Sequence, residues 1–309
     1  VRDNQPMRTC VSLSDVFAIN DFLRESYIQQ GGLYNWEPRR WEGLVFHRND
    51  ADLMTTRANL ATNVGIWSNE YGRIAGVVIP EYPGGVFLQS TRGDVELQRE
   101  MLSWAIAGQS QSADNGAQWL EVWIEETDLP LADVARSLGF VPTSHHQIRR
   151  HQVLEPMPAT LPTLPDGYSV RGIESDADYS KMAALLNAAF GREFHSESEY
   201  RNFATLSPSY RGELEIVVVA PDGSFAAHAG FTAHAAESFV VVEPVCTHPD
   251  HQNLGLARVA MTEGLNRCRA IGIRDAFIEA WYSNPVSNHV YQQMGFVTPV
   301  SEYIWRREV

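Results

Sequence analysis

The sequence predicts a mixed α/β protein (α+β, with a mixed sheet) built from two similarly organised halves. Apolar, β-branched runs alternate with segments of helical period along the chain. The pair Gly139-Phe140 recurs as Gly295-Phe296, an offset of 156 residues that indicates a duplicated domain. Four prolines in the twelve residues 154–165 indicate a stiff, extended linker. We therefore expect domains at 1–153 and 166–309.

The first half shows a strand candidate at 8–12 and then a helix that Ser14 would cap. The aromatic and basic stretch Tyr34–Trp41 either lines a pocket or packs as a tryptophan pair at the surface. The other elements expected here are a hairpin of 64–69 with 73–80, strands at 86–90 and 119–124, helices at 95–107 and 131–138, and a strand toward 149.

The second half shows the same order of elements. It is expected to contain a strand at 166–171, a helix from 176, a helix or lid at 195–206, a hairpin of 214–220 with 224–232, strands at 239–247 and 275–281, a helix from 256, and a short helix after 284.

A loop between the strand 239–247 and the helix from Leu256 predicts an anion site. Pro249 ends the strand, because proline cannot donate to a ladder. The loop 252–257 would then direct free backbone N–H groups and the positive end of the helix dipole at one point, as a diphosphate requires. An ordinary βα turn with a packing glycine is the alternative.

This loop resembles the acyl-CoA-binding motif of the GNAT N-acetyltransferase superfamily. That motif reads Arg/Gln-x-x-Gly-x-Gly/Ala, and Gln252, Gly255 and Ala257 match it in order. The resemblance implies acetyl-CoA as cosubstrate, with its pantetheine arm between the splayed strands 239–247 and 275–281. The residues implied as cofactor contacts are Val245, Cys246, Thr247, Gln252, Asn253, Leu254, Gly255, Leu256, Ala257, Arg258 and Asn284.

A second block resembles the same superfamily. Its pattern, Asn-x(6)-Tyr-x(3)-Gly-Phe, is matched at every interval by Asn284, Tyr291 and Gly295-Phe296. Asn284 is expected to cap the short helix. By resemblance Tyr291 is the acid that protonates the departing CoA thiolate, and a buried phenol bonded to a backbone carbonyl is the alternative.

Two glutamates are candidates for the general base. An amine of pKa about 10.4 is neutral in only about one molecule in 2,500 at pH 7, so a base would assist its attack. Glu243 and Glu279 each lie inside an otherwise apolar strand, where an unpaired carboxylate is costly. A salt bridge or a rim position is the alternative for either.

Other chemistry is less well supported by the sequence. His248, Asp250 and His251 share one loop without further ligands, so we expect no metal. Cys246 is expected to fill a strand and not to act as a nucleophile.

The first half is expected to be a degenerate copy that does not bind the cofactor. It lacks the loop motif, and Asp94 and Glu96 stand at the start of its helix, where they would satisfy the N–H groups and repel a diphosphate. Ala135 stands four residues before Gly139, where Tyr291 precedes Gly295.

Composition limits the partners and the compartment. The net charge of −14 argues against nucleic acid and anionic membranes and would suit a cationic substrate. Three cysteines without paired spacing indicate a reduced, cytoplasmic setting, and neither a run of 18 apolar residues nor a secretory signal is expected. The partners expected are a small amine and, as one option, a second copy of the chain.

Two classes of function follow from these motifs. The first is an N-acetyltransferase acting on a primary amine of a small molecule. The second is a catalytically silent acyl-CoA-binding regulatory protein, because Gln252 and Ala257 are the rarer variants of the loop. Within the first class, the tandem layout and the segment Leu164–Arg171 are similar to the mycothiol synthase family, although that family keeps a more intact loop in its first domain.

Overall fold

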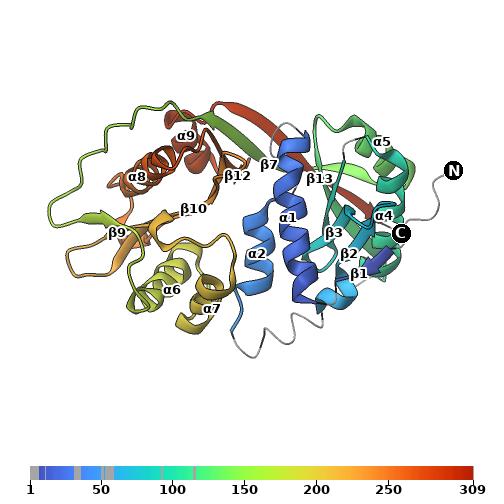
Figure 1. Cartoon of the computed structure of the whole chain (residues 1–309), viewed down its shortest axis with the longest axis horizontal. Helices are drawn as coiled ribbons and strands as arrows, with labels where there is room; N and C mark the ends of the chain where they lie inside the picture. Colours follow the sequence, from blue (N-terminus) through green and yellow to red (C-terminus); the bar gives the residue numbers. More distant parts are fainter. Residues whose placement is uncertain are drawn as a thin grey trace.

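The strands of this computed structural model form one mixed sheet that runs through both halves, with helices packed against it (Figure 1). The structure describes residues 7–10, 12–30, 36–49, 52, 59–91, 93–113 and 116–308. The strand order is β1-β2-β3-β4-β6-β13-β7-β12-β11-β10-β9-β8, and β5 pairs with β6. In this part of the chain, no helix is long and apolar enough to cross a membrane.

The elements of the first half are β1 (Met7–Thr9), α1 (Leu13–Gln30), α2 (Pro38–Phe46), β2 (Gly65–Ser68), β3 (Ile74–Tyr82), β4 (Gly85–Ser90), α4 (Val95–Gln109), β5 (Gln111–Ser112), β6 (Gln118–Glu125), α5 (Leu129–Ser137) and β7 (Val141–Val153). Those of the second half are β8 (Ser169–Arg171), α6 (Ala177–Phe190), α7 (Glu197–Leu206), η1 (Gly212–Leu214), β9 (Glu215–Val219), β10 (Phe225–His234), β11 (Phe239–Thr247), η2 (Pro249–His251), α8 (Leu256–Ala270), β12 (Asp275–Trp281), α9 (Pro285–Gln293) and β13 (Thr298–Glu308).

Most elements lie within a few residues of their predicted places, and the differences have local causes. The Ser14 cap was wrong: α1 begins two residues earlier, where Ser12 and Asp15 form a capping box, with the Asp15 N–H donating to Ser12 Oγ at 3.2 Å and the Ser12 N–H donating to Asp15 Oδ2 at 3.0 Å. The elements α2, which Glu37 caps, and β13 were not predicted.

The last strand of each half pairs with the other half. β13 lies between β6 and β7, antiparallel to both, and β7 pairs with β12 over seven residue pairs, from Asp275–Val153 to Trp281–Gln147. The division at 153 and 166 stays a prediction, but three strand pairings, β6 with β13, β13 with β7 and β7 with β12, join the two halves. The two halves therefore form one continuous framework.

The tryptophans of the aromatic stretch in the first half lie in the hydrophobic core and not at the surface. Trp36 and Trp41 are buried, and Trp41 Nε1 donates to the carbonyl of Val16 at 2.9 Å. Tyr34 lies outside the described residues. The expectation of a surface tryptophan pair was wrong, because α2 packs this stretch against α1.

The linker 154–165 has no helix or strand and passes beside α8 to reach β8 at the far edge of the sheet (Figure 1). It is anchored at its start and near its middle. The Leu154 N–H donates to the carbonyl of Arg274 at 2.7 Å, and the Asn266 side chain bonds both backbone groups of Ala159 at 2.8 Å.

A buried charge cluster joins the halves beneath α2. Arg39 Nη1 lies 3.0 Å from Glu215 Oε1, and His228 Nε2 lies 2.9 Å from Glu215 Oε2. Burial alone would raise the pKa of Glu215, but Arg39 and His228 overcome this and lower it to about 2. The carboxylate is thus held ionised in the interface.

We predict that Glu215→Gln destabilises the protein by about 3 kcal/mol at pH 7, because it leaves the Arg39 charge buried and uncompensated. Since the folded pKa lies below the ordinary value, the contribution of Glu215 is complete above about pH 4.5 and is lost as the pH falls toward 2. Urea unfolding at several pH values should show a weaker acid dependence for the variant. Glu213→Gln, at the exposed Glu213, is the control, and equal losses for both variants would contradict the prediction.

Candidate active site

A gap opens between β11 and β12 in the second half. The two parallel strands pair only at Phe239–Asp275, Val240–Ala276 and Val241–Phe277, after which they diverge. β11 continues to pair with β10 on its other side, and β12 with β7. A register shift of the β10–β11 ladder, opposite Gly230, bends β11 at Glu243-Pro244. The gap lies between the two strands where the resemblance implied that the pantetheine arm binds.

The predicted phosphate loop lies at the wide end of this gap. Gly255, which is the N-cap of α8, has φ +74°, a left-handed conformation that favours glycine, and Asn253 adopts φ +63°. No side chain caps α8, and its first turn contains no acidic residue. The first N–H groups of this helix are therefore oriented toward the loop without a carboxylate over them.

The histidines of the same loop have partners within the chain. His248 Nδ1 accepts from the Asp250 N–H at 3.2 Å, and His251 Nδ1 lies 2.8 Å from the Tyr168 hydroxyl. Elsewhere, His47, His195 and Glu199 form a group with the donor set of a metal site. In that group each histidine Nδ1 already bonds one Glu199 oxygen, so hydrogen bonds satisfy the carboxylate. The absence of a metal stays a prediction.

The second motif places Tyr291 on α9, facing the gap. Asn284 caps α9 as predicted and accepts from the Ser287 N–H at 3.1 Å. Tyr291 is buried, and burial raises the pKa of its phenol to about 12, with the charge of Glu243 adding to the shift. A phenol that stays protonated at neutral pH can donate a proton to a leaving group.

Both predicted bases face one guanidinium from the first half. Arg40, on α2, places Nη2 3.1 Å from Glu279 Oε2 and Nε 3.5 Å from Glu243 Oε2. Glu279 also lies 3.5 Å from Nη1 of the buried Arg149. The salt-bridge alternative therefore holds for both glutamates, and the same contacts bring them together at the gap.

The charge network extends to two further glutamates. Gln147 accepts from Arg40 Nη2 at 3.2 Å and donates to Glu302 Oε2 at 2.6 Å, while Glu125 pairs with Arg149. Burial, followed by the charge of Glu279, raises the pKa of Glu302 to about 7. The cluster thus holds more carboxylates than guanidiniums.

Sequence reasoning missed Arg40 and Glu302. The signal for Arg40 was the pair Glu37-Pro38, an acceptor followed by proline at the first helical position, which marks a helix start. Glu302 had no local signal, because its burial results from β13 inserting between β6 and β7.

The corresponding region of the first half is closed. Asp94 caps α4 and accepts from the Leu97 N–H at 3.4 Å, as the sequence predicted. β4 and β6 pair only at Gly85–Glu121 and Val86–Val122, and beyond them the rings of Phe87 and Trp123 stack with centroids 4.8 Å apart. Buried aromatic rings pack where the second half has its gap.

Comparisons with known proteins agree with this geometry. Residues 179–296 match the model of the acetyltransferase (GNAT) family. Mycothiol acetyltransferases of Streptomyces scabiei and Streptomyces griseus subsp. griseus are 28% and 26% identical over 65% and 61% of this chain. The matches span 65% and 62% of those proteins, less than two thirds of their length.

Two solved structures share the whole fold. A GCN5-related N-acetyltransferase from Sphaerobacter thermophilus has a TM-score of 0.64 at 16% identity and covers 100% of this chain and 96% of its own. A tandem GNAT protein from the clavulanic acid biosynthesis pathway has a TM-score of 0.63 at 14% identity, with 99% and 98% coverage. The tandem GNAT fold predicted from the sequence is thereby confirmed.

We predict that Gly255→Val abolishes acetyl-CoA binding, because a β-branched residue cannot hold the left-handed φ that the loop requires. Gly272→Val is a matched control at the other end of α8: Gly272 has φ +88°, and a Cβ at either glycine would meet no atom within 4 Å. The free energy of unfolding should fall by a similar amount in both variants, but only Gly255→Val should lose acetyl-CoA binding in calorimetry. Equal affinities would remove the loop from the site.

We also expect a stoichiometry of one acetyl-CoA per chain, because Asp94 occupies the helix start in the first half while the start of α8 is uncapped. A like-charge pair at 4 Å costs about 4 kcal/mol at an effective dielectric constant of 20. Calorimetric titration of the intact chain measures this number. A second site would contradict the reading of the first half as a degenerate copy.

Proposed function

We propose that this chain, a member of the GNAT acetyltransferase family with a tandem fold, transfers the acetyl group of acetyl-CoA to a primary amine of a small molecule. The observation that carries the proposal is that Glu243 and Glu279 share the Arg40 guanidinium at the gap between β11 and β12, and that the charge of Glu243 acts on the buried Tyr291. This arrangement supports Tyr291 as the acid and the two glutamates as candidate bases.

The residues support a direct transfer. A carboxylate, Glu243 or Glu279, takes one proton from the ammonium, and the neutral nitrogen attacks the thioester carbonyl. The C–S bond then breaks, and the thiolate of CoA takes a proton from Tyr291. The nitrogen loses its second proton, which restores the Tyr291 phenol, the carboxylic acid returns its proton to water, and the neutral amide is released. Backbone N–H groups near Val245 would stabilise the oxyanion, and the uncapped start of α8 would hold the diphosphate.

The surplus of carboxylates supports an amine as the acceptor. Two guanidiniums, those of Arg40 and Arg149, lie among the carboxyl groups of Glu243, Glu279 and Glu302. The positive charge of an ammonium would therefore complete the local charge balance. Mycothiol acetyltransferase activity, which is the activity named for the Streptomyces relatives, is the second candidate within the same chemistry. A screen of amines against acetyl-CoA, with CoA release as the readout, separates these acceptors from one another and from a silent acyl-CoA-binding protein.

We predict that Tyr291→Phe lowers turnover by about 10- to 10⁴-fold and leaves acetyl-CoA affinity nearly unchanged, because the proton is needed mainly in the transition state. Steady-state rates and calorimetry measure the two quantities.

Glu279→Gln and Glu243→Gln should lose activity that is recovered at high pH, where more amine is already neutral. If neither carboxamide variant alters the pH–rate profile, another group deprotonates the amine.

Arg40 is expected to act as a positioning residue through these glutamates. Arg40→Gln removes the guanidinium that bonds both carboxylates, so kcat should fall by about tenfold while the KM for acetyl-CoA stays nearly unchanged. Arg40→Lys should restore part of the rate, because it keeps a cation at the gap. Equal losses of rate and of acetyl-CoA affinity in Arg40→Gln, without recovery in Arg40→Lys, would assign Arg40 a purely structural role.

A further inference from the structure

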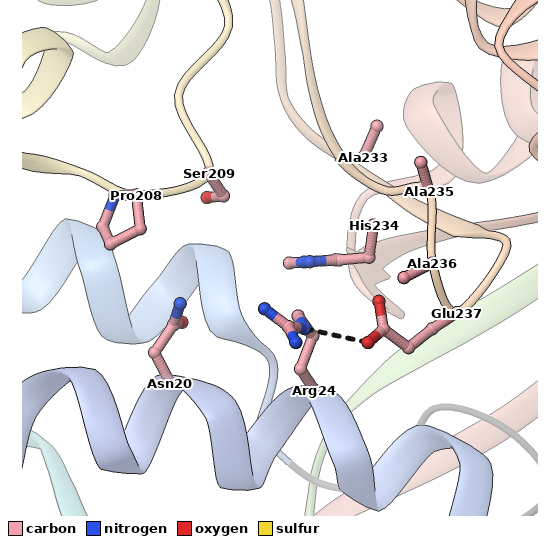
Figure 2. A pocket seen from close by; sticks show the side chains of 9 residues that line it. All are labelled: Asn20, Arg24, Pro208, Ser209, Ala233, His234, Ala235, Ala236 and Glu237. Atoms are coloured by element: carbon pink, nitrogen blue, oxygen red, sulfur yellow. Dashed lines mark hydrogen bonds and ion pairs between the residues drawn. The ribbon is translucent and has the colours of Figure 1, made fainter.

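A second cavity lies between the halves, beside the hairpin of β10 and β11 (Figure 2). It has a volume of about 220 Å³. One wall comes from α1 of the first half, through Asn20 and Arg24, and the opposite wall from the second half, through His234 and Glu237 (Figure 2). Arg24 Nε and Glu237 Oε1, 3.0 Å apart, join the two walls. The site proposed above uses none of these four residues.

Two buried polar atoms at this cavity have no partner among the described residues. They are Asn20 Oδ1 and His234 Nε2, and both residues are 5% exposed. Buried polar groups normally form hydrogen bonds, so atoms without one indicate a ligand or water. Burial, followed by the charge of Arg24, lowers the pKa of His234 to about 3, so its ring is neutral and one nitrogen can accept.

The surroundings of the cavity favour a ligand that donates hydrogen bonds. Ser209, which lines the cavity, donates to Glu42 Oε2, and within the described residues Glu42 Oε1 has no partner. Glu237 adds a second carboxylate. The opposing cation, Arg24, is engaged by Glu237 and lies 3.4 Å from Asp21. Asn20 Oδ1, a ring nitrogen of His234 and the Glu237 carboxylate therefore offer acceptors to an ammonium, which has three N–H groups.

The cavity and the reaction site lie on the same face of one strand. Opposed residues of β10 and β11 share a face, and His234 opposes Phe239 while Gly230 lies against the backbone of Glu243. Phe239 stacks on Tyr27 of α1, so this face points to the first half. His234 lies four residues after Gly230 on β10, and four residues of a strand span about 13 Å. His234 is therefore about 13 Å from the position of Glu243. Thr232, between them, has a buried Oγ1 without a partner in the described chain.

We propose that this cavity binds the far end of the amine acceptor, and that the acceptor is an elongated molecule with a second amino group about 13 Å from the nitrogen that is acetylated. The inference rests on the proposed function. The second ammonium is held by Asn20, His234 and the nearby carboxylates, while the first meets Glu243 and Glu279. The first half thereby takes part in selecting the substrate.

The test compares α,ω-diamines of increasing length with monoamines of the same length, using acetyl-CoA and the intact chain. The ratio of kcat/KM for diamine over monoamine should rise to about tenfold when the nitrogens are about 13 Å apart, which corresponds to about 1.4 kcal/mol of binding. Asn20→Leu and His234→Phe should each abolish this advantage and leave the monoamine rates and acetyl-CoA affinity unchanged. His145→Phe, at an exposed histidine of β7, is the control.

The outcomes separate this inference from the proposed function. Equal rates for diamines and monoamines at every length, unaffected by Asn20→Leu, would overturn the inference and leave the acetyltransferase activity standing. The opposite outcome has two parts: the long diamine binds in calorimetry and Asn20→Leu weakens this binding, but no amine is acetylated. That outcome would overturn the proposed function and support the cavity as an amine site. Two variants are used because retained acetyl-CoA binding in either one shows that the chain is folded.

Discussion

The exchange of terminal strands is the constraint on which the rest of the molecule depends. β13 completes the sheet of the first half, and β7 extends the sheet of the second, so each half needs backbone hydrogen bonds from the other. A flexible contact between domains could not hold a guanidinium within hydrogen-bond distance of two carboxylates. With the sheet continuous, α2 is fixed over β11 and β12, and Arg40 reaches Glu243 and Glu279.

This arrangement gives the first half a role that does not require it to bind a cofactor. The first half has a capped helix start and stacked rings where a cofactor would lie, so it is not suited to bind acyl-CoA. It supplies charge to the second half instead: Arg39 at the buried cluster with Glu215, and Arg40 at the gap. Under the proposed function, the second half carries the reaction site and the first half completes its electrostatics.

The parts that the sequence predicted well are those encoded by local spacing. Gly255 is set by the left-handed turn that its loop requires, and Asn284 by the helix that it caps, so motif and structure coincide. The open helix start of α8 and the occupied start of α4 could likewise be read from the residues present. The strand carboxylates were recognisable because a charge inside an apolar strand needs a partner.

The partners of those carboxylates could not be predicted, because they come from distant parts of the chain. Arg40 precedes Glu243 by about 200 residues, and no local pattern relates them. The strand β13 carries alternating polar and apolar residues without an obvious place, and only its insertion between β6 and β7 buries Glu302. Pairings of this range are decided by topology, which periodicity alone does not specify.

The position of β13 also has a consequence for how the protein is made. Synthesis proceeds from the N-terminus, and domains generally fold as they emerge. Here the half that is synthesised first keeps an unfilled slot between β6 and β7 until residues 298–308 have left the ribosome. Until then both edges of that slot expose unpaired backbone groups, which are templates for pairing with other chains. Completion of the first half therefore waits for β13, and a chain truncated before residue 298 would keep its earliest-made part open.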